Sequence, residues 1–362
     1  MTTARSQVVD PTNSRWYHCI SRCVRQAFLL APASNSASKP ASNSGGDDCG
    51  IGDRKAWISN RLQQLDELFA VSVGGFSTMD NHLHLLLRLD PAEASGWSDE
   101  MVVQRWFKLH PPRGTNRKPL PADQLQELVV KRLADPKWIA QMRGRLSSLS
   151  WFMKSLKEPL ARLVNKAEKC TGAFFEGRFK SVAVLDEQAL LAVAAYIDLN
   201  PVAAGLAATP EASLHTSVHA RVEHVRQQDR QGDLRSALLG SLAGSRAAAG
   251  LEEQLWLIPI EDRRRLDSQR EGMLEGFTLA NYLLLVDCSG RMPREGKAAI
   301  SPEAAEILSR LGSSAEAWQA TLQRLGGGKR LIGRFIASSR AALNAVAQRL
   351  GVSRLANLSA AQ

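Results

Sequence analysis

The sequence predicts an α+β protein, in which an antiparallel sheet backed by helices, in the ferredoxin-like class, precedes an α-rich C-terminal region. Three observations predict this. Over the first 200 residues the patterns read strand, helix, strand, strand, helix, strand, helix. Residues 82–89 alternate with the period of a strand, and strand patterns fade after about residue 208. This order of elements is typical of split βαβ arrangements with helices on an antiparallel sheet.

The first elements follow from local composition. Residues 16–22, Trp-Tyr-His-Cys-Ile-Ser-Arg, alternate in side-chain character and predict a short strand. Residues 31–52 consist mostly of Ala, Ser, Asn, Pro, Gly and Asp, so we expect a flexible insertion that buries little apolar surface. Residues 56–69 space their leucines for one buried helical face, and a strand is expected over residues 69–76.

A hairpin is expected next, because residues 78–81 separate the previous strand from a second one at 82–89. Residues 90–145 are polar and contain several prolines, so they are interpreted as a second insertion. Two helices are expected inside it, at 101–109 and 122–134.

The last elements of this region alternate again between helix and strand. Residues 149–166 predict an amphipathic helix, and residues 174–184 predict a turn followed by a strand. Residues 187–199 predict another helix, which we expect to end at Asn200-Pro201, because a residue before proline disfavours helical geometry.

Three segments are therefore predicted along the chain. Residues 1–13 form an N-terminal tail, residues 14–207 form the α+β domain with its two insertions, and residues 208–362 form an α-helical region of unknown role. With 362 residues, the chain is long enough for two domains.

Composition favours a protein that meets a polyanion. The net charge is +10 and the isoelectric point is near 9.6, and neutralised phosphates release counterions and so add affinity. An ordinary solvated basic surface is the alternative. Five scattered cysteines without a C-x-x-C pair indicate reduced thiols. No run approaches the roughly 20 apolar residues of a membrane span, so we expect a cytoplasmic, nucleoid-associated protein with no membrane partner.

His82 and His84 are candidate metal ligands. Strand alternation puts both imidazoles on one face while Leu83 and Leu85 point to the other. A strand holds two such rings rigidly, and imidazole binds several divalent metals. The alternative is two polar residues on a solvated strand face. Two ligands are too few for a metal, so the hypothesis requires a third.

Tyr196 and Asn200 are candidates for the same site. They are four residues apart on the predicted helix and so share a face. A tyrosine hydroxyl can attack a phosphate and an asparagine carbonyl can bind a metal. The alternatives are a packing tyrosine and a helix-ending asparagine. Of the other two tyrosines, Tyr17 lies on a core strand and Tyr282 in the remote C-terminal region.

Four blocks, in this order, resemble the single-tyrosine members of the HUH nuclease superfamily. The blocks are WYHCISR at 16–22, MDNHLHLL at 79–86, GRFKS at 177–181 and YIDLNPV at 196–202. The likeness is to transposases similar to insertion sequence 200, and especially to their REP-associated group. It covers roughly residues 14–207. The two insertions, Phe179 and Ala203 depart from the pattern of shorter members, which leaves the DNA target undefined.

The resemblance implies a transposase-type enzyme that cleaves and rejoins single-stranded or hairpin DNA. It implies that His82, His84 and Asn200 bind Mg²⁺ or Mn²⁺ and that Tyr196 is the nucleophile. A 5′-phosphotyrosine intermediate stores the bond energy, and the absence of a phosphate-binding G-x-x-x-x-G-K-[ST] motif agrees with an ATP-independent reaction. A homodimer is a further possibility for the assembly of this protein.

Cationic and aromatic residues near these blocks are candidate DNA contacts. Arg22, Arg178 and Lys180 are expected to meet phosphates near the site. Arg263, Arg264 and Arg265 form a more distant basic run, and Trp151, Phe174 and Phe175 are candidates for base stacking. Each is alternatively surface charge or core.

Two other function classes stay open at this level. One is a non-catalytic nucleic-acid-binding regulator on the same scaffold, which would bind DNA in a salt-dependent way without cleavage. The other is a metal-dependent hydrolase in which water replaces Tyr196, which would nick DNA without forming an adduct.

Overall fold

The structure is a computed structural model that describes residues 9–10, 12, 14–31, 53–238, 250–264, 271–291, 315–326 and 335–337. Its chain divides into two compact units, each assembled from segments far apart in the sequence. The first unit is Met1–Ala31, Val73–Leu87 and Phe175–Gln362, and the second is Pro32–Ser72 and Arg88–Phe174. Most of the insertion expected at 31–52 lies outside the described residues.

A five-stranded sheet lies mainly in the first unit, in the order β2-β3-β1-β4-β7. Its first four strands are antiparallel, and β7 joins β4 in parallel. A separate ribbon pairs β5 with β6. The strands are β1 (Trp16–Arg22), β2 (Val71–Thr78), β3 (His82–Leu89), β4 (Lys180–Val184), β5 (Glu261–Asp262), β6 (Leu274–Glu275) and β7 (Phe335–Ile336). The predicted α+β class is confirmed, while the ferredoxin-like topology stays a prediction.

Register determines which side chains share a face of the sheet. His18 of β1 lies opposite Val182 of β4, and Ile20 lies opposite Lys180. Residues directly opposite each other in an antiparallel pair point to the same side. The strands expected at 16–22 and 82–89 are confirmed in both bounds.

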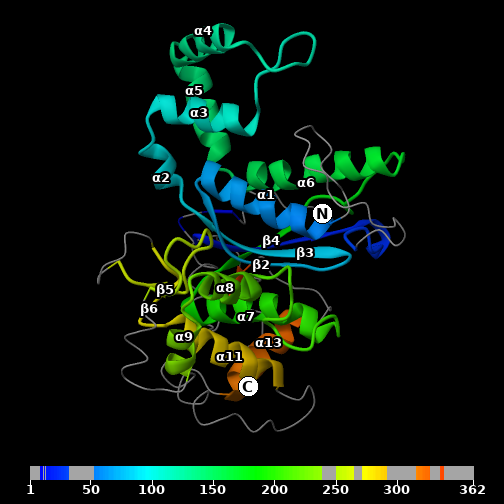
Figure 1. The fold of residues 1–362 in the computed structure, drawn as a ribbon, viewed down its shortest axis with the longest axis vertical. Helices are drawn as coiled ribbons and strands as arrows, with labels where there is room; N and C mark the ends of the chain where they lie inside the picture. Colours follow the sequence, from blue (N-terminus) through cyan, green and yellow to red (C-terminus); the bar gives the residue numbers. More distant parts are fainter. Residues whose placement is uncertain are drawn as a thin grey trace, which may run out of the picture. The chain divides into compact units, whose positions relative to one another are not determined.

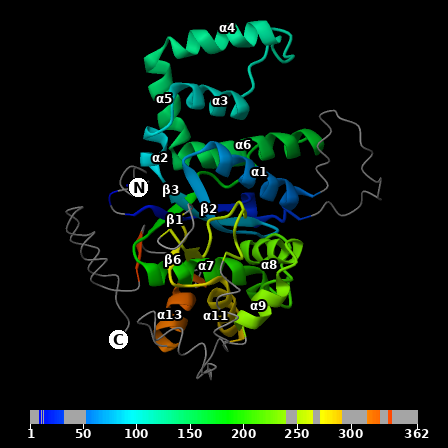
Figure 2. The ribbon, with the colours of Figure 1, turned by 60° about the vertical axis from the view of Figure 1, so that its left-hand side comes forward.

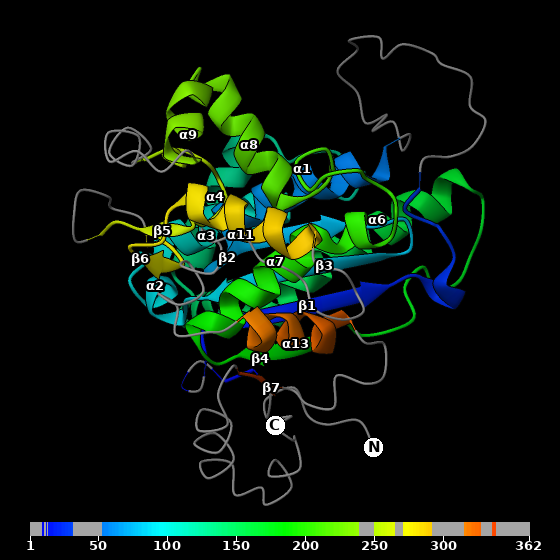
Figure 3. The same cartoon turned by 90° about the horizontal axis from the view of Figure 1, so that it is seen from below.

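Helices of the first unit cover the sheet in two layers. Figures 1 and 2 show α7 and α8 next to the sheet, with α9, α11 and α13 beyond them. Figure 3 shows α7, α11 and α13 running side by side, and α11 and α13 both contact α7. The helices are α7 (Glu187–Ala203), α8 (Ser217–Gln227), α9 (Gln231–Leu238), α11 (Leu279–Arg291) and α13 (Ala315–Gly326), with a short 3₁₀ turn η2 (Val24–Gln26) after β1.

Helix α7 is the central helix of this unit. The Asp186 side chain caps its first turn by accepting a hydrogen bond from the Ala189 amide at 2.8 Å. Its apolar residues are buried on nearly every side, against Leu86 and Val184 of the sheet and against α11 and α13. Burial all round explains why this stretch is apolar all round rather than amphipathic.

The helix end expected at Asn200-Pro201 is wrong. Helix α7 continues through Pro201 to Ala203, and the Ala204 amide still bonds to the Asn200 carbonyl at 3.0 Å. The local bias of a residue before proline is small beside the burial of a whole helix. Because the helix continues, Asn200 keeps helical geometry one turn after Tyr196.

The C-terminal region is not remote from the predicted α+β domain. Its β7 extends the sheet, and its α11 carries Tyr282 into contact with α7. The Asp198 carboxylate accepts hydrogen bonds from the Tyr282 hydroxyl at 2.5 Å, the Ser217 hydroxyl at 2.6 Å and the Val218 amide at 3.0 Å. This buried carboxylate therefore joins α7, α8 and α11.

A second buried polar cluster anchors the segment before the β5–β6 ribbon. Arg221 of α8 forms an ion pair with Glu252, and it donates to the carbonyls of Gly74 at 2.8 Å and Ile258 at 2.9 Å. Glu252 in turn accepts from the Ile260 amide at 2.8 Å. A buried ion pair is tolerated only when such additional hydrogen bonds satisfy it.

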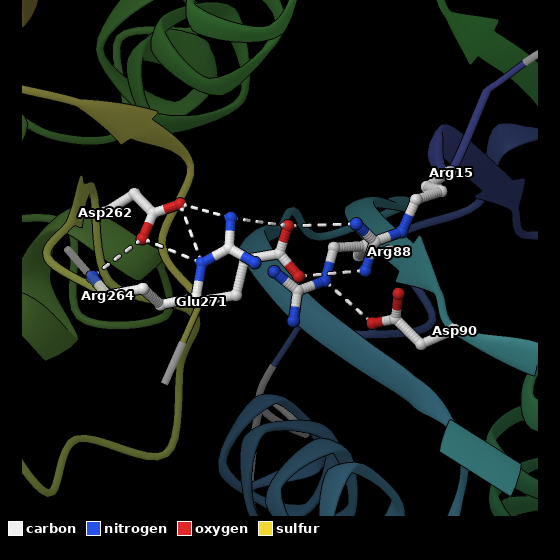
Figure 4. A network of polar contacts seen from close by, with 6 residues as sticks. All are labelled: Arg15, Arg88, Asp90, Asp262, Arg264 and Glu271. Atoms are coloured by element: carbon white, nitrogen blue, oxygen red, sulfur yellow. Dashed lines mark hydrogen bonds and ion pairs between the residues drawn. The ribbon is translucent and has the colours of Figure 1, made fainter. Parts of the chain in front are cut away.

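The ribbon itself carries an ion-pair network at the surface (Figure 4). Glu271 binds Arg15 through two bonds of 2.9 Å and approaches Arg264 at 3.3 Å, and Arg264 also pairs with Asp262 at 2.7 Å. The second unit contains the other pair drawn, Arg88 with Asp90 at 2.8 Å.

The second unit is mostly helical. Helix α1 packs on α6, and α5 contacts α2, α3, α4 and α6. Figure 2 shows α3, α4 and α5 close together. The helices are α1 (Arg54–Leu68), α2 (Pro91–Ser95), α3 (Asp99–Leu109), α4 (Ala122–Leu133), α5 (Pro136–Leu146) and α6 (Leu149–Ala167).

The region interpreted as an insertion, residues 90–145, thus holds four helices instead of the two expected. Helix α5 was missed, although its start carries a capping signal. Asp135 accepts from the Trp138 amide at 3.0 Å, and Pro136 occupies the first turn. Helix α1 ends at Leu68, so the strand expected from residue 69 begins only at Val71.

Candidate functional site

The two predicted metal ligands lie side by side on β3. The ring centroids of His82 and His84 are 4.9 Å apart, and His84 is buried. A third imidazole, His18 of the neighbouring strand β1, stacks on His84 with centroids 5.1 Å apart. His18 Nε2 lies 2.9 Å from His84 Nδ1, which is a hydrogen bond between two buried rings.

Tyr196 of α7 faces this group of imidazoles. Its ring meets His84 edge-on at 5.6 Å between centroids and His18 at 6.0 Å. Its helical neighbours Ala195 and Ile197 are fully buried, whereas Tyr196 is half-buried. The structure therefore places Tyr196 against His84, whose ring also contacts His82.

Asn200 lies one helical turn further along the same face of α7. It forms a hydrogen bond with His82, and its own Nδ2 atom is buried without a partner among the described residues. Which terminal atom of an asparagine amide is oxygen follows from its surroundings. Because this bond raises the pKa of His82, His82 donates it and the Asn200 oxygen accepts it, which leaves the amide nitrogen as the atom without a partner.

Burial keeps all three imidazoles neutral. Desolvation lowers the pKa of His18 to about 3 and that of His84 well below its ordinary value. Desolvation and the positive charge of Arg22 lower the pKa of His82 to about 4, although the bond with Asn200 raises it. A neutral imidazole has the lone pair that a metal requires.

A hydrogen bond engages one ring nitrogen of each predicted ligand. His82 Nδ1 lies 2.6 Å from the Asn81 side-chain oxygen, and His84 Nδ1 is bonded to His18. In metal sites the non-ligating nitrogen of a histidine has just such a partner. This leaves Nε2 of His82, Nε2 of His84 and the Asn200 oxygen as the atoms that could bind a divalent metal together with further oxygen ligands.

The described residues hold no group of three or more His, Cys, Asp or Glu side chains arranged to hold a metal ion. The predicted ligand set contains only two such residues and one amide. It is suited to a cation that is completed by water or by phosphate oxygens of a substrate.

The predicted DNA contacts Arg22, Arg178 and Lys180 are exposed. Arg22 and Lys180 both share the His18 face of the sheet by alternation and register. The charge of Arg22 reaches both His82 and His84. Arg178 lies two residues before Lys180, in the segment that precedes β4.

Other candidates for DNA contact are not available to a ligand. Phe174 and Phe175 are buried, which excludes them as stacking platforms. Arg263 and Arg264 are engaged with carboxylates of the β5–β6 ribbon. Arg265 lies outside the described residues.

Sequence reasoning missed His18. Its position within the first block was visible, but only the pairing of β1 with β3 places it against His84. A period-two reading of β1 puts His18 on the face of Arg22, and that was the available signal.

Comparisons with known proteins leave the family unassigned. The chain matches no protein-family model and no curated protein. Among solved structures it is similar to a REP-associated tyrosine transposase bound to a REP hairpin, with a TM-score of 0.31 and 11% sequence identity. That match covers 58% of this chain and 80% of the other. A likeness of this size assigns neither a family nor an activity to this chain. No helix among the described residues is long and apolar enough to cross a membrane.

Proposed function

We propose that this protein is a metal-dependent single-tyrosine enzyme that nicks and rejoins single-stranded DNA, a transposase-type strand transferase. The observation that carries the proposal is the meeting of Tyr196 with His84 at 5.6 Å between ring centroids, beside His82 and Asn200. A packing tyrosine does not require three neutral imidazoles and a buried amide nitrogen without a partner around it.

In the proposed reaction, the Tyr196 hydroxyl oxygen attacks the phosphorus of a scissile phosphodiester. One P–O bond forms to Tyr196 and the bond to the 3′ oxygen of the preceding nucleotide breaks. The phenolic proton is lost to solvent and the departing 3′ oxygen takes up a proton, so a 5′-phosphotyrosine and a free 3′-hydroxyl result. Attack of a 3′-hydroxyl on the phosphotyrosine reverses the step, and no ATP is consumed.

His82, His84 and Asn200 would hold Mg²⁺ or Mn²⁺, which when bound supplies positive charge to the scissile phosphate. The chain's own residues have separate tasks. His18 and Asn81 orient the two ligating rings. Helix α7 fixes Tyr196 because its flanking residues are buried, and Arg22, Arg178 and Lys180 bind phosphates of the strand.

The test is cleavage of labelled single-stranded and hairpin DNA, taken from inverted repeats beside the gene, in the presence of Mg²⁺ or Mn²⁺. We expect a covalent protein–DNA adduct that is abolished in Tyr196→Phe while DNA binding is retained. Tyr17→Phe is the matched control and should retain the adduct. An adduct of normal yield in Tyr196→Phe contradicts the assignment.

A non-catalytic DNA-binding protein is the second candidate, which the positive charge of the chain favours. It predicts salt-dependent binding without metal-dependent cleavage. Nicking without an adduct would instead indicate a hydrolase that uses water. Light scattering of the same preparation measures the size of the assembly and so tests whether the protein is a homodimer.

A further inference from the structure

A cluster of indoles and cations lies in the second unit. Trp106 of α3 and Trp151 of α6 meet edge-on with ring centroids 5.8 Å apart. The Arg145 guanidinium of α5 lies over both rings, 4.4 Å from Trp151 and 5.5 Å from Trp106, and the Lys154 ammonium lies 4.6 Å from Trp151. The exposed ring of His110 lies 4.6 Å from Trp106. We call these five residues the indole cluster.

Positive charge around the indole cluster is poorly balanced. Arg61 of α1 donates to the Ser155 carbonyl and the Gln64 side chain, which are both neutral. Among the described residues neither Arg61 nor Arg145 has a carboxylate ion-pair partner. Glu158 is shared, since it approaches Lys154 at 3.8 Å and also pairs with Arg162. Burial lowers the pKa of His110, and the positive charges of Arg61, Lys154 and Arg145 lower it further.

The described part of the surrounding unit has the same bias. Residues 53–72 and 88–174 contain 19 lysines and arginines against 12 aspartates and glutamates. This surplus of seven is most of the net charge of +10 of the whole chain. Like charges held close together destabilise a fold, and an anion bound to them removes that cost.

Layered rings and cations have a specific use. A guanidinium near an indole adds a second planar group on which a further ring can stack, and an exposed imidazole is another such group. Nucleic-acid bases stack on such surfaces without regard to sequence, while neighbouring cations follow the phosphates. An acidic peptide offers charge but no planar ring to extend the stack.

We propose that the indole cluster is a binding site for single-stranded nucleic acid. Unpaired bases stack against the rings of Trp106, Trp151 and His110, and Arg61, Arg145 and Lys154 bind the phosphates. The site does not depend on Tyr196 or on any metal. Its test and that of the proposed function can therefore fail separately.

A second aromatic group in the same unit serves as the control. Trp138 is half-buried, lies 6.1 Å from Phe107 between ring centroids, and has the Arg132 guanidinium 5.0 Å above it. It thus matches Trp151 in residue type, burial and cation, but it is not a member of the indole cluster.

The experiment measures fluorescence anisotropy of labelled oligo(dT) of about 16 nucleotides, a length within the range that single-strand binders cover. It uses the full chain carrying Tyr196→Phe, with EDTA, so that cleavage is excluded. Trp151→Leu should weaken binding about 10-fold, within the range found for one stacked base, and Trp138→Leu less than about 2-fold. Lys154→Gln, at an exposed position, should reduce the steepness of the salt dependence by about 0.7.

An abasic strand of equal length distinguishes stacking from charge. We expect it to bind at least about 5-fold more weakly than oligo(dT). Three results would each overturn the inference. The abasic strand binds as tightly as oligo(dT), poly-glutamate competes as well as oligo(dT), or the Trp151→Leu variant keeps its affinity while its circular dichroism spectrum is native. Should Trp151→Leu fail to fold, unchanged affinity and salt slope in Lys154→Gln would overturn it instead.

Discussion

Removal of one hydroxyl group tests how firmly the C-terminal helix α11 is joined to the helix that carries Tyr196. Tyr282→Phe removes the hydroxyl that donates to the Asp198 carboxylate at 2.5 Å. The rest of the side chain keeps its size and shape. Both residues are almost fully buried, so water does not replace the lost bond.

The magnitude follows from the partners that remain. A buried acceptor that loses its donor costs about 1 to 3 kcal/mol. Asp198 keeps its bonds from Ser217 and Val218, so we expect a loss near the middle of that range. About 2 kcal/mol in the free energy of unfolding corresponds to a rise of about 30-fold in the unfolding equilibrium constant.

Urea unfolding of a double-mutant cycle measures this energy. The cycle comprises the wild type, Tyr282→Phe, Asp198→Asn and the double variant, and we expect a coupling of about 1 to 2 kcal/mol. Tyr17→Phe is the matched control, because its buried hydroxyl donates to the Ser14 carbonyl at 2.7 Å and not to Asp198. Tyr17→Phe should show no coupling to Asp198→Asn. Zero coupling between positions 282 and 198 would refute the reasoning.

Three further predictions concern the same unit. Burial raises the pKa of Asp198 above its ordinary 3.8, so the stability that the protonated carboxyl contributes is present below pH 3.8 and is lost as pH rises through the raised native pKa. Urea titrations should therefore show the stability of Asp198→Asn rising relative to wild type between pH 3.8 and the raised native pKa. A difference in stability that stays constant with pH would argue against this prediction. His18→Ala should lower Mn²⁺ affinity in calorimetric titration about 10- to 100-fold, whereas His224→Ala on α8 should leave it unchanged; equal affinities of wild type and His18→Ala would exclude an orienting role for His18. Gly74→Ala should lower the free energy of unfolding by about 1 to 3 kcal/mol, because the added Cβ would lie 2.5 Å from the Trp16 ring. Gly75→Ala, whose added Cβ has its nearest contact at 3.2 Å, should lower it less in thermal unfolding. Equal losses of stability in the two variants would count against this packing.

The core of the fold was predictable wherever the pattern was local. Alternation of side chains predicts the first and last residues of β1 and β3. Apolar spacing predicts α1, α6 and α7 to within a few residues. The end of α7 was not predictable in this way. Pro201 has a known local bias, but the apolar surface that overrides it comes from α11 and α13, more than 70 residues away in sequence.

The candidate site was predictable only in part, for the same reason. His82 and His84 share a strand, and Tyr196 and Asn200 share a helix, so each pair followed from spacing alone. That the two pairs meet, and that His18 joins them, depends on the sheet order and on the packing of α7. The indole cluster collects residues from α3, α5 and α6, which no single pattern connects.

The most direct test of the central claim is to locate the covalent bond. The protein is incubated with Mn²⁺ and its single-stranded substrate, digested with nuclease and trypsin, and examined by mass spectrometry. The tryptic peptide 181–221 contains Tyr196 and no other tyrosine. We predict a nucleotide phosphate on this peptide, lost in Tyr196→Phe and in His84→Ala. A phosphate found only on another peptide, or an adduct that persists in Tyr196→Phe, would contradict the account.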